Sequence, residues 1–285
     1  MAELTGTGTP GAEPVGATPP RTVPADGASG HPVPGTGGTS RRPVSGAGGR
    51  SPGAGGRPRV RWWRRPWVGP LAVVALAFLA FSLPPYLSLD PSLSRVPLEG
   101  GFAAYYPMLV AHVVFGAIAM VTCGLQIWPW LRRRHPVAHR RIGRVYVLGG
   151  VLPAGVLGLV VGAAGPFGPM TQVSSVILAA LWLACTVAGF RAARRRRFAD
   201  HRRWMIRSFA LTFSIITNRV WGAIAMIVLM PQAETVFGGS DIALIQTVSG
   251  LAAWLGWTTS LLLAEWWLER GGAAGRRRAP VPARG

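Results

Sequence analysis

The sequence predicts an all-α membrane protein with about six transmembrane helices, and three observations support this fold class. Hydrophobic residues make up 49% of the 285 residues, although the formal net charge is +20. Six apolar runs reach the roughly 20 residues that a helix needs to cross a hydrocarbon core. Two segments of the chain also repeat one another at a shift of 62 positions. A soluble basic protein would not combine these features.

The apolar runs are expected to be helices, because in lipid every backbone polar group must be satisfied within its own segment. They cover residues 67–86, 107–128, 142–164, 171–190, 204–230 and 242–266. Residues 1–60 are rich in Gly, Pro, Ser and Thr and are predicted to form a disordered cytoplasmic tail. Residues 61–270 then form the transmembrane domain, and residues 271–285 form a basic cytoplasmic tail.

The repeat defines two hairpins. Each copy consists of an apolar run, an Arg-loaded loop with a histidine, and a second apolar run. The pairs matched in one ungapped register include Pro107 with Pro169, Cys123 with Cys185, and His139 with His201. The second to fifth spans are therefore predicted to form two parallel repeated helical hairpins, related by a pseudo-twofold axis along the membrane normal.

The distribution of Arg predicts the orientation. Arg-rich loops precede the first span, lie at residues 132–144 and 191–203, and follow the sixth span, whereas the intervening loops hold only Arg95. The excess of cations on cytoplasmic loops then places both termini in the cytoplasm. The bilayer is the expected partner, and the Arg loops could bind anionic lipid headgroups or only fix the orientation. Nucleic acid is not expected as a partner, because topology alone explains the charge.

Two histidines are candidate ligands for a cofactor. His139 and His201 each begin a His-Arg-Arg sequence at the cytoplasmic mouth of a helix, and the two helices run the same way. Such a pair could hold a metal or a b-type haem, with nearby Arg residues neutralising the haem propionates. The alternative is two interfacial histidines that bond to lipid or backbone. A separate metal pair of His135 and His139 is disfavoured, because Pro136 moves His135 off the helix.

A second set of polar residues lies at the depth of the outer half of the membrane. Arg219 is the least favourable of them in a membrane, since an Arg at the centre of a helix raises the free energy of membrane insertion by about 2.5–3.5 kcal/mol. Together with Asn218, His112 and Gln246 it could line an outward-facing pocket for an anion, or it could belong to a structural polar network. His112 could also bind a haem alone, relay protons, or bond within the bundle. Glu265, near the inner end of the sixth span, is a candidate partner for an Arg.

Several stretches together resemble a known family. They are His112, Gly116, Gln126, the stretch from His139 to Tyr146, Trp182, the stretch from His201 to Leu211, and Arg219. From about Tyr105 through the fifth span, the chain resembles the bacterial predicted-membrane-protein family called domain of unknown function 2306. The resemblance implies a polytopic membrane protein and implies no activity. Cys123 departs from the small residue expected at its position, which weakens a redox role for that thiol.

Three functions follow as hypotheses for a multi-pass protein of the bacterial inner membrane. The first is a redox or haem-associated protein that uses His139 and His201, or His112. The second is a transporter-like or anionic ligand- or lipid-binding protein centred on Arg219. The third is a structural or assembly subunit without a ligand. The sequence contains no P-loop, dinucleotide-binding glycine pattern or nucleophile elbow, so it assigns no enzymatic reaction.

Overall fold

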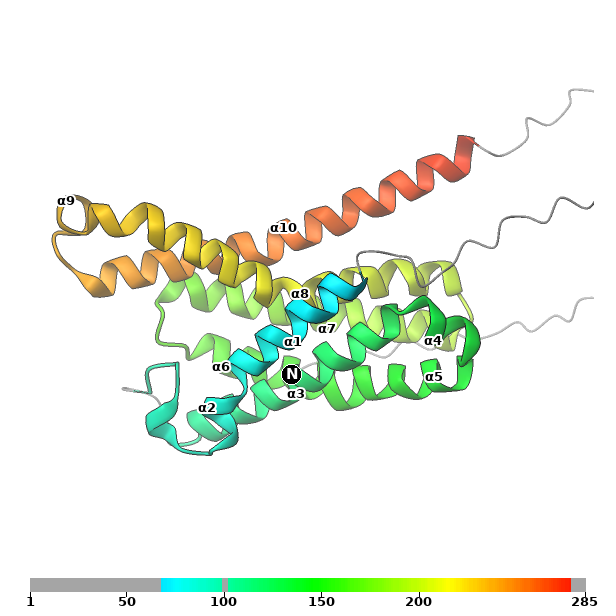
Figure 1. The fold of residues 1–285 in the computed structure, drawn as a ribbon, viewed down its shortest axis with the longest axis horizontal. Helices are drawn as coiled ribbons and strands as arrows, with labels where there is room; N and C mark the ends of the chain where they lie inside the picture. The colour runs from blue at the N-terminus through cyan, green and yellow to red at the C-terminus, as the bar shows by residue number, and fades with distance from the viewer. Residues whose placement is uncertain (1–67, 99–101, 278–285) are drawn as a thin grey trace, which may run out of the picture. The chain divides into compact units, whose positions relative to one another are not determined.

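Proline positions divide the apolar runs into helices of different lengths (Figure 1). The computed structural model describes residues 68–98 and 102–277, and no strand occurs in these two ranges. The helical elements are α1 (Val68–Ser82), α2 (Pro84–Leu87), η2 (Pro91–Leu93), α3 (Tyr105–Ile127), α4 (Pro129–Arg134), α5 (Pro136–Arg144), η3 (Val145–Val151), α6 (Leu152–Ala163), α7 (Pro169–Arg194), α8 (Phe198–Leu229), η4 (Met230–Gln232), α9 (Ala233–Phe237) and α10 (Asp241–Arg277). The predicted all-α fold class is confirmed.

Most of the predicted spans are single long helices. In the described part of the chain, five segments are long and apolar enough to cross a membrane: Tyr105–Ile127, Pro136–Ala163, Pro169–Arg194, Phe198–Phe237 and Asp241–Arg270. They contain the second to sixth predicted spans. The last of them continues as α10 to Arg277, well beyond the predicted end at residue 266. The predicted tail of residues 1–60 and the final residues 278–285 lie outside the described ranges.

The first predicted span is interrupted near its end. α1 stops at Ser82 after 15 residues, and α2 begins at Pro84. Pro84 and Pro85 lack an amide hydrogen, so two consecutive helical hydrogen bonds cannot form. At 1.5 Å per residue, α1 rises about 22 Å against a hydrocarbon core of about 30 Å. The expectation of about six spans therefore holds roughly, with α1 as the shortest.

The third span is continuous but not uniformly α-helical. It consists of α5, the π-helix η3 and α6 in succession. Pro153 cannot donate a hydrogen bond, and its ring would clash with the carbonyl four residues earlier. In the residues before it the ladder shifts to the wider π spacing, and the Leu152 amide donates to the Val147 carbonyl. Single π segments of this kind often occur at functional sites.

The helices of the bundle pack closely through small residues. α3 lies against η3 and α6, α7 lies between α6 and α8, and α10 runs beside α8 (Figure 1). At Gly150 in η3 the approach is close, since an added Cβ would lie 2.9 Å from the Ala119 Cα. Buried residues around this crossing include Met120, Tyr146 and Val151. The lack of a side chain at Gly150 therefore allows α3 and η3 to approach closely.

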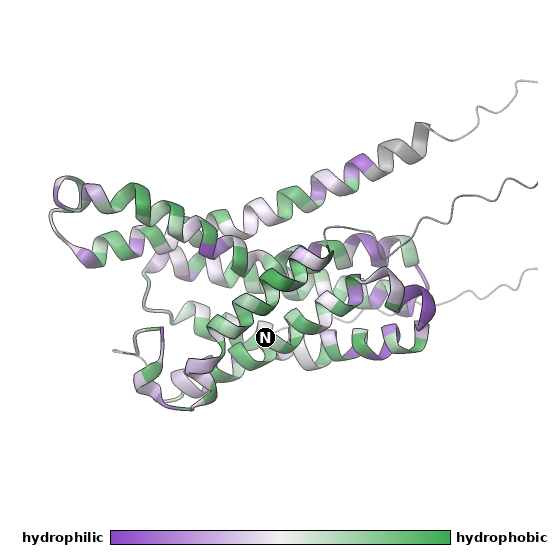
Figure 2. Ribbon diagram, in the orientation of Figure 1, coloured by the Kyte–Doolittle hydropathy of each residue, from purple (hydrophilic) through white to green (hydrophobic). Residues whose placement is uncertain are grey.

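Polar residues gather at one end of the hairpins. Figure 2 shows hydrophilic residues concentrated at α4, α5 and the adjoining ends of α7 and α8. We call this the Arg-rich end, defined by residues 128–144 and 191–203. The opposite end includes α2, α9 and the loop of residues 164–168, and it carries Asp90, Glu234 and Asp241. The long helices between the two ends are largely apolar, as a membrane requires.

The Gly150 crossing yields a prediction on stability. Gly150→Ala places a methyl group against the Ala119 backbone, which cannot move without shifting α3. We expect the free energy of unfolding to fall by about 1–3 kcal/mol, the usual cost of overpacking. Thermal unfolding of the purified protein in detergent measures this change. Gly124→Ala is the control, because nothing lies within 4 Å of its added Cβ; an equal loss in both variants would contradict the prediction.

Candidate functional site

Two helices carry a histidine near their start at the Arg-rich end. His139 lies in α5, and His201 lies in α8. α5 begins at Pro136, whose fixed φ suits the first position of a helix. His135, just before it, has φ −129° and ψ 67° and so lies between helices, as predicted. His135 therefore does not share a helical face with His139.

A hydrogen bond deeper in the bundle fixes how these two helices face each other. The Tyr146 hydroxyl lies 2.5 Å from the Ser208 Oγ, and the two residues occupy equivalent positions in the repeat. Each lies seven residues beyond its histidine, which is about 10 Å along the helix and within about 20° of the same direction. Tyr146 and Ser208 face each other, and His139 and His201 lie near the same faces of their helices as these two residues. The two rings are close enough to interact electrostatically.

The ring orientation of two histidines is set by main-chain carbonyls. His201 Nδ1 lies 2.9 Å from the Gly189 carbonyl oxygen, and His112 Nδ1 lies 2.8 Å from that of Ala154. A carbonyl only accepts, so in both rings Nδ1 carries the hydrogen when the imidazole is neutral. Nε2 then keeps its lone pair, which is the tautomer of a histidine that ligates through Nε2. The described structure gives His112 no histidine neighbour, and Gly158 of α6 lies against its ring.

His139 differs from His201 in its surroundings. Its Nδ1 atom is buried and has no hydrogen-bond partner among the described residues. Its main-chain oxygen accepts a hydrogen bond of 2.6 Å from Gln126 Nε2, which holds the first turns of α5 against α3. Arg132 and Arg140 lie within electrostatic range of the ring. A buried ring nitrogen without a partner is uncommon and points to a group that the chain itself does not supply.

Behind the two histidines lies a cluster of buried hydroxyl groups that the sequence did not predict. We call Tyr146, Trp182, Thr186, Ser208 and Thr212 the hydroxyl cluster. Tyr146 contacts Thr212 at 2.9 Å, Ser208 contacts Thr186 at 2.6 Å, and Trp182 Nε1 donates to Thr212 at 3.0 Å. Tyr146, Thr186 and Ser208 are almost fully buried. The one signal in the sequence was the repeat itself, which matches Tyr146 with Ser208.

Each hydrogen in the hydroxyl cluster has an acceptor. Thr186 and Thr212 donate to main-chain oxygens of Trp182 and Ser208, respectively. Ser208 must therefore donate to Thr186, because the hydrogen of Thr186 is already used. The hydrogen of Tyr146 remains for Ser208 or Thr212. The cluster is fully satisfied and joins η3, α7 and α8, so it acts as a clamp between the two hairpins.

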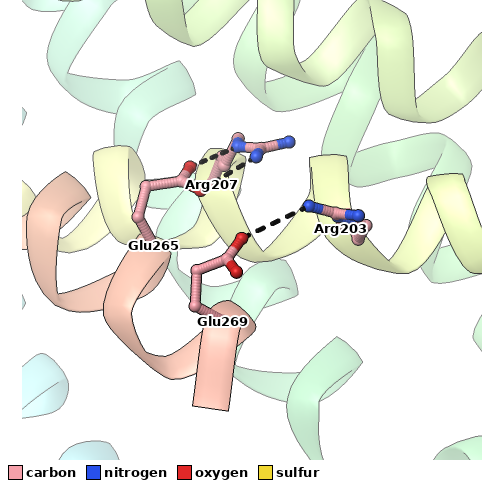
Figure 3. A network of polar contacts seen from close by, with 4 residues as sticks. All are labelled: Arg203, Arg207, Glu265 and Glu269. Carbon is pink, nitrogen blue, oxygen red and sulfur yellow. Dashed lines mark hydrogen bonds and ion pairs between the residues drawn. The ribbon is translucent and has the colours of Figure 1, made fainter. Parts of the chain in front are cut away.

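An ion-pair network lies on the other side of α8, where it joins α8 to α10 (Figure 3). Arg207 binds Glu265 through two contacts, 2.5 Å from Nε to Oε1 and 2.9 Å from Nη2 to Oε2. The Arg207 guanidinium also lies over the Trp204 ring, 4.7 Å from its centre. Arg203 Nη2 lies 3.8 Å from Glu269 Oε1. The expected Arg partner of Glu265 is thus found, and the paired geometry attaches α10 to the second hairpin.

The residues proposed for an outer pocket lie on separate surfaces. Arg219 is exposed, and Asn218 lies with its backbone against Gly256 of α10. The Gln246 side chain lies against Gly168 in the loop before α7. Neither a hydrogen bond nor an ion pair joins any two of Arg219, Asn218, Gln246 and His112 in the described part of the chain. The pocket therefore remains a prediction from sequence without a geometric site.

Comparison with protein families shows which family the chain matches. A family model described as predicted membrane protein (DUF2306) matches residues 109–268. This range runs from the first turns of α3 into α10, so it includes the sixth span, which the resemblance in sequence did not cover. No curated protein and no solved structure matches the chain. The match covers more than half of the chain and includes all the candidate site residues.

The hydroxyl cluster yields a second prediction. Tyr146→Phe keeps the ring but removes the hydroxyl that bonds to Ser208 and Thr212. We expect the free energy of unfolding to fall by about 1–3 kcal/mol, because buried hydroxyl groups lose a partner. Chemical or thermal unfolding in detergent measures the loss. Tyr106→Phe is the matched control, since the Tyr106 hydroxyl is buried without a partner. A neutral Tyr146→Phe would show that the cluster is not a clamp.

Proposed function

The chain belongs to the DUF2306 family of predicted membrane proteins, and we propose that it is a membrane redox protein that holds a b-type haem between His139 and His201. The observation that carries the proposal is the contact between Tyr146 and Ser208. With the helices aligned by this contact, the two equivalent histidines would face one another at the Arg-rich end. Two histidines on neighbouring helices are a usual ligand set for a haem iron in a helical bundle.

Three features of the residues present support this proposal. His201 has Nδ1 on the Gly189 carbonyl, which leaves Nε2 as the ligand atom. No hydrogen bond from a described residue reaches the ring of His139, so that ring is available as the second ligand. Arg132 and Arg140 lie in electrostatic range of His139 and would neutralise two carboxylates on the ligand. When bound, the haem would supply one-electron transfer.

Other parts of the chain would hold the two histidines in a fixed geometry. Gln126 anchors the main chain of His139 to α3. The hydroxyl cluster, about 10 Å deeper, holds the two ligand helices at a constant separation. The apolar spans around it exclude water. These features would fix the ligand geometry in the way a preorganised site requires.

The proposal includes an orientation. The Arg-rich end lies in the cytoplasm, with both termini on that side, in the inner membrane of a bacterial cell. The support is the excess of Arg in the loops at that end and the acidic residues at the other. The proposed haem would then lie near the cytoplasmic surface, within reach of soluble electron donors or acceptors.

The absorption spectrum of the purified protein tests the proposal. Protein from haem-sufficient cells should show a Soret band, and His139→Ala or His201→Ala should each reduce the bound haem at least tenfold, because a bis-histidine site needs both ligands. His135→Ala is the matched control: it removes an exposed histidine of the same Arg-rich segment, whose ring makes an edge contact with Trp130. That variant should keep the band.

Two results would overturn the assignment. A colourless, fully folded protein from haem-sufficient cells would favour a structural or assembly role. A Soret band that is lost in His112→Ala but kept in both His139→Ala and His201→Ala would move the site to the opposite end of α3. Circular dichroism and elution volume establish that each variant is folded.

A further inference from the structure

A groove lies at the corner between α4 and α5, outside the histidine site. It has a volume of about 500 Å³. Its lining combines cationic and apolar side chains: Arg134, His135, Pro136, Val137, Ala138, Arg141 and Ile142. The groove exists because His135 turns the chain out of the helix between Arg134 and Pro136. α5 then restarts at an angle that leaves this corner open.

The cations of the groove have no acidic partner within the described ranges. Arg134 and Arg141 are both exposed, and neither makes a hydrogen bond or an ion pair with a described residue. The second copy of the repeat differs here. Arg203, which is equivalent to Arg141, lies 3.8 Å from Glu269, and the neighbouring Arg197 lies 3.5 Å from Asp200. The first copy thus keeps two guanidinium groups available for an external anion.

The remaining walls of the groove are apolar. Val137 is 50% exposed although it is a large hydrophobic residue, and Ala138 and Ile142 line the groove with it. Trp128 and Trp130 lie close together at the start of α4, with ring centres 5.2 Å apart, and Trp130 makes an edge contact with the His135 ring. Tryptophan rings of this kind mark the level where headgroups meet hydrocarbon. The groove therefore combines a cationic rim and an apolar wall at the depth of the membrane surface.

We propose that this groove binds one anionic phospholipid, with the phosphate between Arg134 and Arg141 and the acyl chain along Val137 and Ile142. Guanidinium groups bind phosphate oxygens through paired hydrogen bonds. A free phosphate would use the cations and leave the apolar wall exposed, whereas a phospholipid satisfies both. The site does not depend on the proposed haem, since none of its lining residues is a proposed ligand.

Native mass spectrometry of the full chain, released from nanodiscs of phosphatidylglycerol mixed with phosphatidylcholine, tests this site. The wild type should retain one phosphatidylglycerol per chain in preference to phosphatidylcholine. Arg134→Ala/Arg141→Ala should weaken that retention about tenfold or more, because two cations near the surface are lost. The matched control is Arg194→Ala/Arg195→Ala, which removes the same charge from exposed residues of the other Arg loop. It should change retention by less than about twofold.

A third variant distinguishes binding of the whole lipid from binding of its headgroup alone. Val137→Ser should weaken the retention of phosphatidylglycerol. It should leave the binding of soluble glycerol phosphate, which has no acyl chain, unchanged. Equal losses in the two double-Arg variants would overturn the proposal in favour of diffuse charge attraction. Displacement of the lipid by millimolar inorganic phosphate would show an anion site instead of a lipid site. Unchanged elution and thermal unfolding of the variants exclude misfolding as the cause of a loss.

Discussion

The absence of water in the hydrocarbon core is the constraint on which this structure depends. A hydroxyl placed there must find its partner within its own helix or on a neighbouring one, since an unpaired polar group in lipid costs several kcal/mol. Tyr146 meets this requirement through Ser208 and Thr212, and Ser208 meets it through Thr186. Each of these contacts crosses between helices. The hydroxyl cluster thus determines which faces of the two hairpins meet.

The same constraint acts on the backbone. Pro153 removes one helical donor in the middle of the third span, and the residues before it shift to the π spacing of η3, in which the Leu152 amide donates to the Val147 carbonyl. The wider turn lies where Tyr146 enters the hydroxyl cluster, so the irregularity and the polar contact occupy the same level. At the end of α1, two adjacent prolines remove two donors, and there the helix is interrupted. The helix continues past a single missing amide donor, whereas two consecutive missing donors end it.

These cases show what the sequence could predict. Hydropathy and the Arg loops predict the long spans, because both depend on composition along the chain. The repeat predicts that His139 and His201 are equivalent. It does not predict the contact between Tyr146 and Ser208, which lie 62 residues apart and on which the proposed pairing of the two histidines rests. The exposure of Arg219 could not be predicted either, because the depth of a residue in a span does not determine which face of the helix it occupies.

The two copies of the repeat have diverged in how their cations are used. In the second copy, Arg203 and Arg207 pair with carboxylates of α10, so part of the charge of that copy serves to attach a further helix. In the first copy, Arg134 and Arg141 are exposed and pair with no carboxylate among the described residues. The Arg side chains of the two hairpins would thus have different partners. Those of the second hairpin pair with carboxylates of the same chain, and those of the first would bind an anion from the membrane. An internal repeat in a membrane protein permits this, because duplicated loops can keep their topology while their side chains change partners.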